Sequence, residues 1–368
     1  MKLEGLRVID LSSFLPGPYL TLALADHGAT VVKVENPDGG DPGRYIGPSQ
    51  DGCTTFFRNL NRGKQSITLD LKTTEGREAL LTLCETADVF IESFRPGIMN
   101  RLGVDYDQVK ERNPAIIYCS ISAYGQSGPY RDRPAHDLGV EALAGLLSMT
   151  LGEDERPALP GVPVADLLAG LQGLAGVLMA LYRRQLTGKG DYLDISMHDS
   201  ALAGCLNILG PAIAEGRQPI AKHERTTGGS AFYRTYETSD GRFIALAGQE
   251  PKFVRLLLQA LERQDLISLC EQGPGPHQQT VIDALAEQFK RHDLNYWDDF
   301  LQQLNVCYGV VKNLPEALDD PQILSRNMVW SDTTGIRHIG TPIRFRNEPA
   351  SLCPEAPALG ANNDRPNM

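Results

Sequence analysis

Three segments place acid–base side chains at the start of expected helices. His136-Asp137 begins one helix, Asp166 begins a long apolar helix, and Glu250 precedes Pro251 at the start of a third. Enzymes use imidazoles and carboxylates to move protons, and an aspartate can also attack a carbonyl carbon. An acid at a helix start is also a common N-cap, which stabilises the helix by about 1 kcal/mol. The sequence therefore leaves a catalytic and a structural interpretation of these residues.

Basic residues gather at three places in this acidic chain. Arg62 and Lys64 form one group, Lys72 follows an expected strand, and Arg95 with Arg101 follows another. Ligands of open α/β sheets bind at the carboxyl ends of the strands. We therefore expect a ligand that carries phosphate groups, with solvated loop cations as the alternative.

Composition excludes several classes of protein. The chain has 368 residues, 42% hydrophobic and 22% charged, and a formal net charge of -11 at pH 7. These values are typical of a globular protein of about two domains and argue against nonspecific nucleic-acid binding. Its seven cysteines stand singly, without the paired spacing of a metal or redox site, and the amino terminus lacks a signal-peptide pattern. We expect a cytoplasmic protein that binds no nucleic acid, membrane or metal.

The first half of the chain alternates short β-rich runs with helical patterns, which is typical of parallel βαβ units. Helices are expected over about 136–149 and 166–184. The most apolar run, 167–182, is shorter than the roughly 18 residues that would cross a bilayer, and we interpret it as a buried helix. Strands are expected in LRVIDLS, VVKVEN, SITLDL, DVFIESF, IIYCSIS and DYLDISM. These elements predict an α/β fold with an open, Rossmann-like parallel sheet.

The second half changes class. An apolar helix is expected over about 201–215, and the polar stretch 217–229 has no periodicity. The run 231–248 alternates around Ser239-Asp240-Gly241, which predicts a β-hairpin followed by amphipathic helices from about 251, 280 and 295. We predict a large domain over 1–205, a linker over 206–229, a small α+β domain over 230–325, and a C-terminal return to the large domain over 326–368.

The first βα turn does not have the form of a dinucleotide-binding loop, although Glu35 stands where a ribose-binding acid would lie. Only Gly17 of the G-x-G-x-x-G pattern is present, and Pro18 has no N–H to donate to a phosphate. We expect Gly17-Pro18 to begin a helix instead.

Several segments together resemble the family III CoA transferase and α-methylacyl-CoA racemase superfamily, whose members are also called CaiB/BaiF-like. The similarity covers nearly the whole chain in the family's order. It is carried by the opening LRVIDLSSFLPGPY, by GATVVKVE, NLNRGKQSITLDLK and ESFRPGIMNRLG, by the Asp166 helix, and by TGKGDYLDISM and GGSAFYRTYETSDGRFIAL.

The resemblance implies a fold, a substrate and an assembly. The fold would be a Rossmann-like large domain, a smaller α+β domain reached by a linker, and a C-terminal return to the large domain. The substrate would be an acyl-CoA thioester, with coenzyme A as part of it and no separately bound cofactor. The chains would form an interlocked homodimer. The family's CoA contacts fall here on Phe14, Leu15, Pro16, Leu69, Lys72, Phe94, Arg95 and Arg101.

Two chemistries share this family scaffold, and both use the aspartate at position 166. In the transferases it is a nucleophile that forms a mixed anhydride and then a thioester with CoA. In the racemases the aspartate works with a histidine on the other side of the substrate α-carbon. A glutamate of the small domain holds that histidine. His136 and Glu250 resemble these racemase partners, and no GGGG-type loop of the transferases is seen near 227–229.

We therefore predict a racemase, with Asp166, His136 and Glu250 as its catalytic residues and a CoA transferase as the alternative. Racemisation needs a proton carrier on each face of the α-carbon, and N–H groups at a helix start could bind the enolate oxygen. The sequence departs from the racemase pattern H-D-I-N-Y, because Leu138-Gly139-Val140 follow Asp137. The expected reaction needs no metal or redox cofactor.

Overall fold

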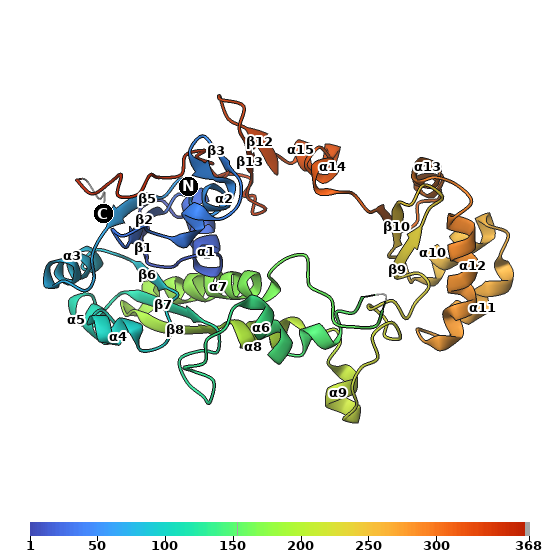
Figure 1. Ribbon diagram of the computed structural model, residues 1–368, viewed down its shortest axis with the longest axis horizontal. Coiled ribbons are helices and arrows are strands. Elements are labelled where there is room, and N and C mark those ends of the chain that lie inside the picture. The colour runs from blue at the N-terminus through green and yellow to red at the C-terminus, as the bar shows by residue number, and fades with distance from the viewer. Residues whose placement is uncertain (153, 365–368) are drawn as a thin grey trace. The chain divides into compact units, whose positions relative to one another are not determined.

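The computed structural model describes residues 1–152 and 154–364 (Figure 1). The chain divides into two compact units. The large unit consists of Met1–Ala144, Pro160–Gly204 and the segment from Pro321 onward, and the small unit of Gly145–Leu159 and Cys205–Asp320. Each unit is described by itself below.

A six-stranded parallel sheet forms the centre of the large unit. All six strands predicted from the first half of the sequence are present. Their order is β5-β2-β1-β6-β7-β8, so the chain works outward from β1 in both directions. The strands are β1 (Arg7–Asp10), β2 (Thr30–Glu35), β5 (Gln65–Thr68), β6 (Val89–Glu92), β7 (Ile117–Ser122) and β8 (Asp191–Ser196).

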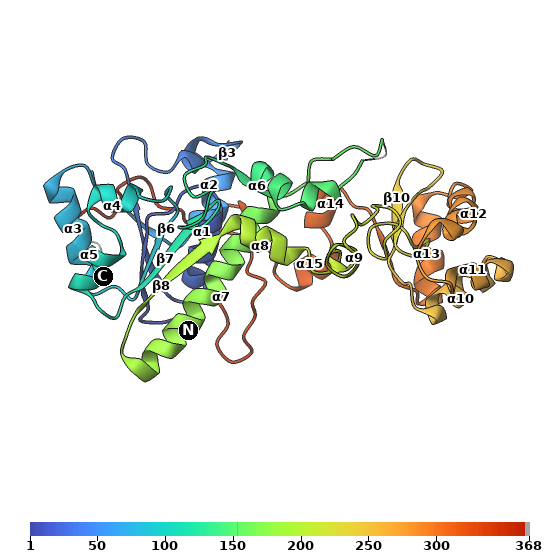
Figure 2. The ribbon, with the colours of Figure 1, turned by 90° about the horizontal axis from the view of Figure 1, so that it is seen from below.

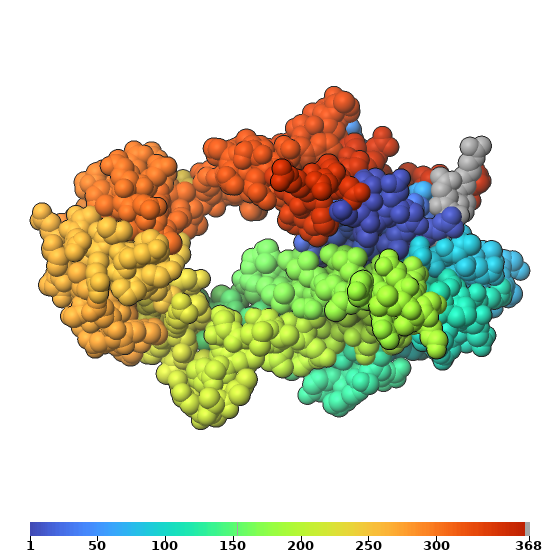
Figure 3. All heavy atoms as spheres, turned by 180° about the vertical axis from the view of Figure 1, so that it is seen from behind, coloured from blue at the N-terminus to red at the C-terminus, as the bar shows by residue number. Residues whose placement is uncertain are grey.

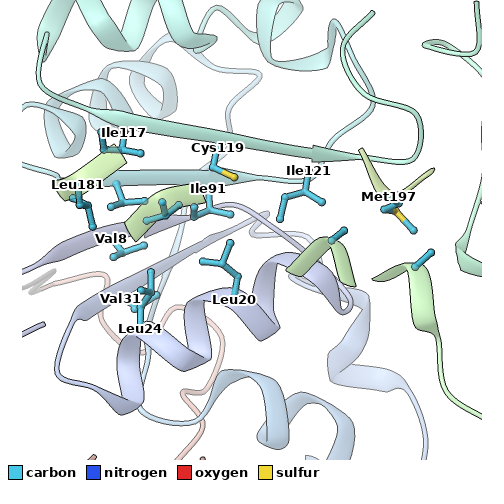
Figure 4. Close-up of a cluster of buried hydrophobic side chains, with 14 of the residues drawn as sticks. Val8, Leu20, Leu24, Val31, Ile91, Ile117, Cys119, Ile121, Leu181 and Met197 are labelled. Carbon is cyan, nitrogen blue, oxygen red and sulfur yellow. The ribbon is translucent and has the colours of Figure 1, made fainter. Parts of the chain in front are cut away.

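Helices cover both faces of this sheet, which is why its strands are continuous apolar runs. Along β1, Val8 packs with α1 (Pro16–Asp26) and α7 (Val164–Thr187), in the cluster drawn in Figure 4. The next residue, Ile9, points to the other face, where α3 (Thr74–Cys84) and α5 (Tyr106–Arg112) lie. This alternation gives the large unit two hydrophobic cores, one on each side of the sheet.

Helix α7 has 24 residues, which makes it longer than predicted, and by length and composition it could cross a membrane. Figure 2 shows it lying along β7 and β8. A Cβ added to Gly170 would lie 2.7 Å from the Pro16 carbonyl oxygen, so α1 approaches closely at this glycine. The opposite face is exposed, so the predicted buried helix is buried on one face only. We call this face the α7 strip: Leu171, Leu178, Met179, Tyr182 and Leu186.

The C-terminal segment returns to the N-terminal part of the large unit, and Figure 3 shows its red atoms beside the blue N-terminal atoms. Asn362 exchanges hydrogen bonds with the backbone of Ser66 in β5, at 2.9 and 3.0 Å. The segment therefore pairs with the outer edge of the sheet. The remaining elements of this unit are η1 (Pro42–Tyr45), β3 (Ser49–Gln50), β4 (Cys53–Thr54), α2 (Thr55–Asn61), α4 (Ile98–Leu102), α6 (Asp137–Leu143), α8 (Met197–Gly204), α15 (Pro321–Ser325), β12 (Val329–Ser331) and β13 (Arg337–Ile339).

The small unit contains a three-stranded antiparallel sheet of order β11-β10-β9. Its strands β9 (Arg234–Glu237) and β10 (Phe243–Leu246) form the predicted hairpin, whereas the short β11 (Tyr308–Val310) was not predicted. The predicted amphipathic helices are present, with Phe289 and Trp297 in the core. The helices are η2 (Leu146–Ser148), α9 (Gly210–Glu215), α10 (Pro251–Ala260), η3 (Gln264–Leu266), α11 (Ile267–Cys270), η4 (Pro276–Gln278), α12 (Gln279–Phe289), α13 (Leu294–Leu304) and α14 (Leu314–Leu318).

The single helix expected over 201–215 was wrong. Helix α8 ends at Gly204 and α9 begins at Gly210, with turns between them. Pro211 would remove a hydrogen bond from a continuous helix and clash with the preceding turn, so the chain starts a new helix there.

Candidate active site

A cavity of about 390 Å³ opens in the large unit beside the carboxyl ends of β1, β6 and β7. Its walls are the loops after these strands, the segment before α6, and the first turns of α7 and α8. Ligands of open α/β sheets bind at this edge. The predicted site residues that line it are Phe14, Pro16, Phe94, Arg95, His136 and Asp166.

Phe14 adopts a left-handed backbone conformation with φ of 63°, which is uncommon for a residue with a side chain. Its N–H donates to Asp41 Oδ1 at 3.3 Å, and Lys33 Nζ donates to the Ser12 carbonyl at 2.7 Å. Lys33 and Asp41 pair at 2.8 Å, with side chains only 1% exposed. Strain of this kind persists only where the surroundings hold it. The buried pair therefore fixes the loop that carries Phe14.

The turn from β1 into α1 needs its glycine for packing. A Cβ on Gly17 would lie 2.2 Å from the Cβ of Ser12, so no other residue fits without movement. Helix α1 begins at Pro16 with Leu15 as its N-cap, which confirms the prediction that this segment begins a helix.

Asp166 lies in the first turn of α7 and lines the cavity. Burial, together with the negative charges of Asp137 and Glu141, raises the pKa of its carboxyl to about 7. A carboxyl group that titrates near neutral pH can act as a nucleophile or exchange protons there.

His136 is the N-cap residue of α6, but its exposed side chain makes no capping hydrogen bond. The ring instead packs against Phe14, edge to face. The structure therefore brings His136 and Asp166 to the same cavity and leaves the imidazole accessible to a ligand.

Two N–H groups at the start of α7 are already occupied. The N–H of Val164 donates to Glu141 Oε1 at 2.8 Å, and the N–H of Asp166 donates to Asp137 Oδ1 at 3.0 Å. The expectation that N–H groups at this helix start could bind an enolate oxygen is therefore wrong for these two groups, because their hydrogens point to carboxylates of α6.

The basic residues divide into buried and exposed groups. Lys64 Nζ lies 3.1 Å from Asp10 Oδ2 with both side chains fully buried, and Arg62 pairs with Asp26, also in the interior. Arg62 and Lys64 are therefore structural, and the expectation that they face a phosphate was wrong. The exposed cations are Lys72, Arg95 and Arg101.

The remaining predicted site residues lie outside the cavity wall. Leu69 follows β5 and is partly buried against the second core, and Lys72 lies in the turn after it. Arg101 is in the last turn of α4. Glu250, the N-cap residue of α10, is exposed in the small unit and makes no capping hydrogen bond.

Sequence reasoning missed two arginines of the cavity wall, Arg131 and Arg133. They stand in an apparently irregular loop, GQSGPYRDRPA, and the signal was their spacing just before His136. Arg133 lies over the Tyr130 ring, 5.4 Å from its centroid, while Arg131 is 3.4 Å from Asp132. Within residues 1–152 and 154–364, no group of three or more His, Cys, Asp or Glu side chains is placed to hold a metal ion.

Comparisons with known proteins agree on one family. The profile of CoA-transferase family III matches residues 3–363. The chain is 31% identical to human succinyl-CoA:glutarate CoA-transferase, over 97% of this chain and 83% of the relative. It is 33% identical to acetyl-CoA:oxalate CoA-transferase of Acetobacter aceti, over 93% and 88% of the two chains. A CaiB/BaiF family protein from Brucella suis has a similar structure, with a TM-score of 0.84, 31% identity and coverage of 98% and 97%.

These comparisons correct the predicted activity. The relatives named above are CoA transferases, so the racemase assignment was wrong and the alternative fits better. His136 and Glu250 resembled racemase residues, but a histidine and a glutamate at these places do not define the reaction. The profile match over residues 3–363 shows that the chain belongs to CoA-transferase family III.

Proposed function

We propose that this protein transfers CoA between two carboxylic acids, with Asp166 as the nucleophile. The observation that carries the proposal is the position of Asp166. Its carboxyl lines the cavity at the carboxyl edge of the sheet and has a pKa of about 7, raised first by burial. At neutral pH a large fraction of the Asp166 carboxyl is ionised. Because this carboxylate is less well solvated than one on the surface, it is more nucleophilic.

The reaction conserves charge at each step. The Asp166 carboxylate attacks the thioester carbonyl of the donor, and the C–S bond breaks to give a mixed anhydride and the CoA thiolate. The thiolate attacks the Asp166 carbonyl, which releases the donor acid as a carboxylate and leaves CoA on Asp166 as a thioester. The acceptor carboxylate then repeats these steps in reverse order, and Asp166 is regenerated. No proton needs to be supplied.

We propose that CoA lies along the carboxyl edge of the sheet. Phe14, Leu15 and Pro16 follow β1, Leu69 and Lys72 follow β5, and Phe94 and Arg95 follow β6. Because the strands are parallel, these segments share one edge. The exposed cations Lys72, Arg95 and Arg101 would bind the phosphates.

We propose that one of the acids is a dicarboxylic acid. The relatives are named for glutarate and oxalate. Arg131 and Arg133 line the cavity that contains Asp166, and guanidinium groups bind carboxylates through paired hydrogen bonds. These arginines would hold the carboxylate that does not react. His136 would contact the same bound acid.

We propose a homodimer, as in the assembly that the family resemblance implies. The α7 strip supports a dimer, because five exposed apolar side chains lie on one helix face. Light scattering should give the mass of two chains, and Leu178→Glu with Met179→Glu should weaken the dimer if this face is buried in it. A fully active monomer would contradict this assembly.

Trapping the covalent intermediate tests the transfer proposal. Incubation with an acyl-CoA and borohydride should reduce a thioester at Asp166 to the alcohol, which mass spectrometry of the peptide would locate. Asp166→Asn should give no such product and no transfer. An active enzyme whose Asp166 stays unmodified, or transfer by the Asn variant, would reject the nucleophile.

A further inference from the structure

Helix α6 carries two acids that bind the start of α7. Asp137 and Glu141 lie four residues apart, so they share one face of α6. Through the hydrogen bonds from the Val164 and Asp166 N–H groups, they hold the backbone of the turn that presents the Asp166 side chain. The proposed reaction assigns no role to either acid.

Glu141 is fully buried, although acids are rarely so. Its Oε1 accepts from Val164, whereas its Oε2 has no hydrogen-bond donor among the described residues. The Asp137 carboxyl and the Ala165 N–H also lie close to Glu141. Burial raises the pKa of Glu141, and the neighbouring Asp137 carboxyl acts in the same direction. The two carboxyls therefore place negative charge beside Asp166.

Other basic side chains line the same cavity as Asp166. These are Arg95, Arg131, Arg133 and His136, and among the described residues none forms an ion pair with Asp166. The neighbouring charges that act on the Asp166 carboxyl are those of Asp137 and Glu141, and they act in the same direction as burial.

We propose that Asp137 and Glu141 are positioning residues for CoA transfer: they fix the α7 turn and, through like charge, favour the covalent forms in which Asp166 is uncharged. This inference rests on the proposed function. When Asp166 oxygen bonds to the acyl carbon and the C–S bond breaks, the charge leaves Asp166 with the CoA thiolate. When the thiolate then forms the aspartyl-CoA thioester, the charge leaves with the carboxylate of the released donor acid, so both intermediates relieve the repulsion from α6.

Isosteric variants separate charge from shape. Asp137→Asn and Glu141→Gln each keep an oxygen that accepts from α7 but remove one of the two negative charges. Each should lower by about one unit the pH at which adduct formation on Asp166 is half-maximal, which corresponds to a tenfold change in proton affinity. Each should also reduce the equilibrium constant for loading CoA onto Asp166 by about tenfold. Asp199→Asn, an exposed acid on α8 outside the site, is the matched control and should change neither quantity.

The outcomes distinguish the two proposals. Wild-type protein that forms the adduct, with an unshifted midpoint in both folded variants, would overturn the role of α6 and leave the transfer proposal standing. Wild-type protein that forms no Asp166 adduct would contradict both. If the buried Glu141→Gln does not fold, Asp137→Asn decides by the same measurement.

Discussion

The rings of Phe14 and His136 meet edge to face, with centroids 6.4 Å apart and planes at 81°. One ring comes from the loop after β1 and the other from the start of α6, so the contact joins two parts of the cavity wall. Phe14 makes this contact from a left-handed backbone conformation. A strained residue that is also 42% exposed is better explained by ligand contact than by folding stability.

Phe14→Gly should therefore separate binding from stability. Glycine adopts a positive φ without strain, which offsets its larger entropy in the unfolded chain, so the free energy of unfolding should change by less than about 1 kcal/mol. The KM for acyl-CoA should rise about tenfold, because a large apolar contact is lost. Phe14→Ala is the control, since it removes the ring but keeps the strain, and should be less stable than the glycine variant. An unchanged KM in both variants would contradict a role in CoA binding.

The pH dependence of transfer should report Asp166. Below a pH of about 7 the carboxyl is protonated and cannot attack, so kcat/KM should rise up to tenfold per pH unit and level off above that pH. Its folded pKa is raised above the unfolded value, so ionised Asp166 costs stability at pH values above both. Asp166→Asn should therefore increase the free energy of unfolding more at pH 8 than at pH 5. A rate that is flat between pH 5 and 8 would argue against this group.

The proposed phosphate contacts should affect binding more than turnover. Neutralising Lys72, Arg95 or Arg101 with glutamine should raise the KM for acyl-CoA about three- to tenfold and leave kcat nearly unchanged, because these contacts are equal in ground and transition states. Added salt should reduce the difference between variant and wild type. Arg112→Gln, which removes a surface arginine paired with Glu78 and Glu85, is the control. Three unchanged KM values would return these cations to the solvated-loop interpretation.

The two arginines of the cavity wall should determine acid selectivity. Replacing both Arg131 and Arg133 with glutamine should lower kcat/KM about tenfold or more for a dicarboxylic acceptor, because its second carboxylate loses its partners. A monocarboxylic acceptor of equal chain length should be affected little. Competition assays with the two acids measure this ratio directly. An equal loss for both acids would instead place the arginines on CoA.

The buried Lys64–Asp10 pair predicts a stability effect. Lys64→Met should lower the free energy of unfolding by about 3–5 kcal/mol in urea titrations, because it leaves a buried carboxylate without its partner. Burial disfavours the charge of Asp10, but Lys64 and Lys33 lower its pKa to about 2, so its contribution should be lost as the pH falls from about 4 to 2. Adding Asp10→Asn should recover part of the loss. Lys72→Met, on the surface, should stay within about 0.5 kcal/mol of wild type.

The sequence predicted the sheet well for a physical reason. A strand buried on both faces, such as β7, is a short apolar run that turn residues interrupt clearly. Three-residue elements such as β11 carry no periodicity and were missed. The prediction of one helix over 201–215 joined two segments of similar hydropathy, because it gave too little weight to Pro211 as a helix breaker.

The site was only partly predictable. Asp166 and His136 were recognised because they begin helices, and the structure places both at one cavity. The environment of a charge is not visible in the sequence, so Lys64 in the interior and Lys72 on the surface looked alike. The interaction of Asp137 with Asp166 was missed because hydrogen bonds between helices depend on packing, not on spacing along the chain.

The pairing of Asn362 with Ser66 has a consequence for how the protein is made. The outer edge of β5 is completed by Asn362 and Asn363, which are synthesised long after β5 itself. Until then this edge exposes unpaired N–H and C=O groups, which invite pairing with other chains. The small unit is synthesised before Pro321 and can complete its own core earlier. During translation the sheet that carries the active site is therefore the later of the two to be closed.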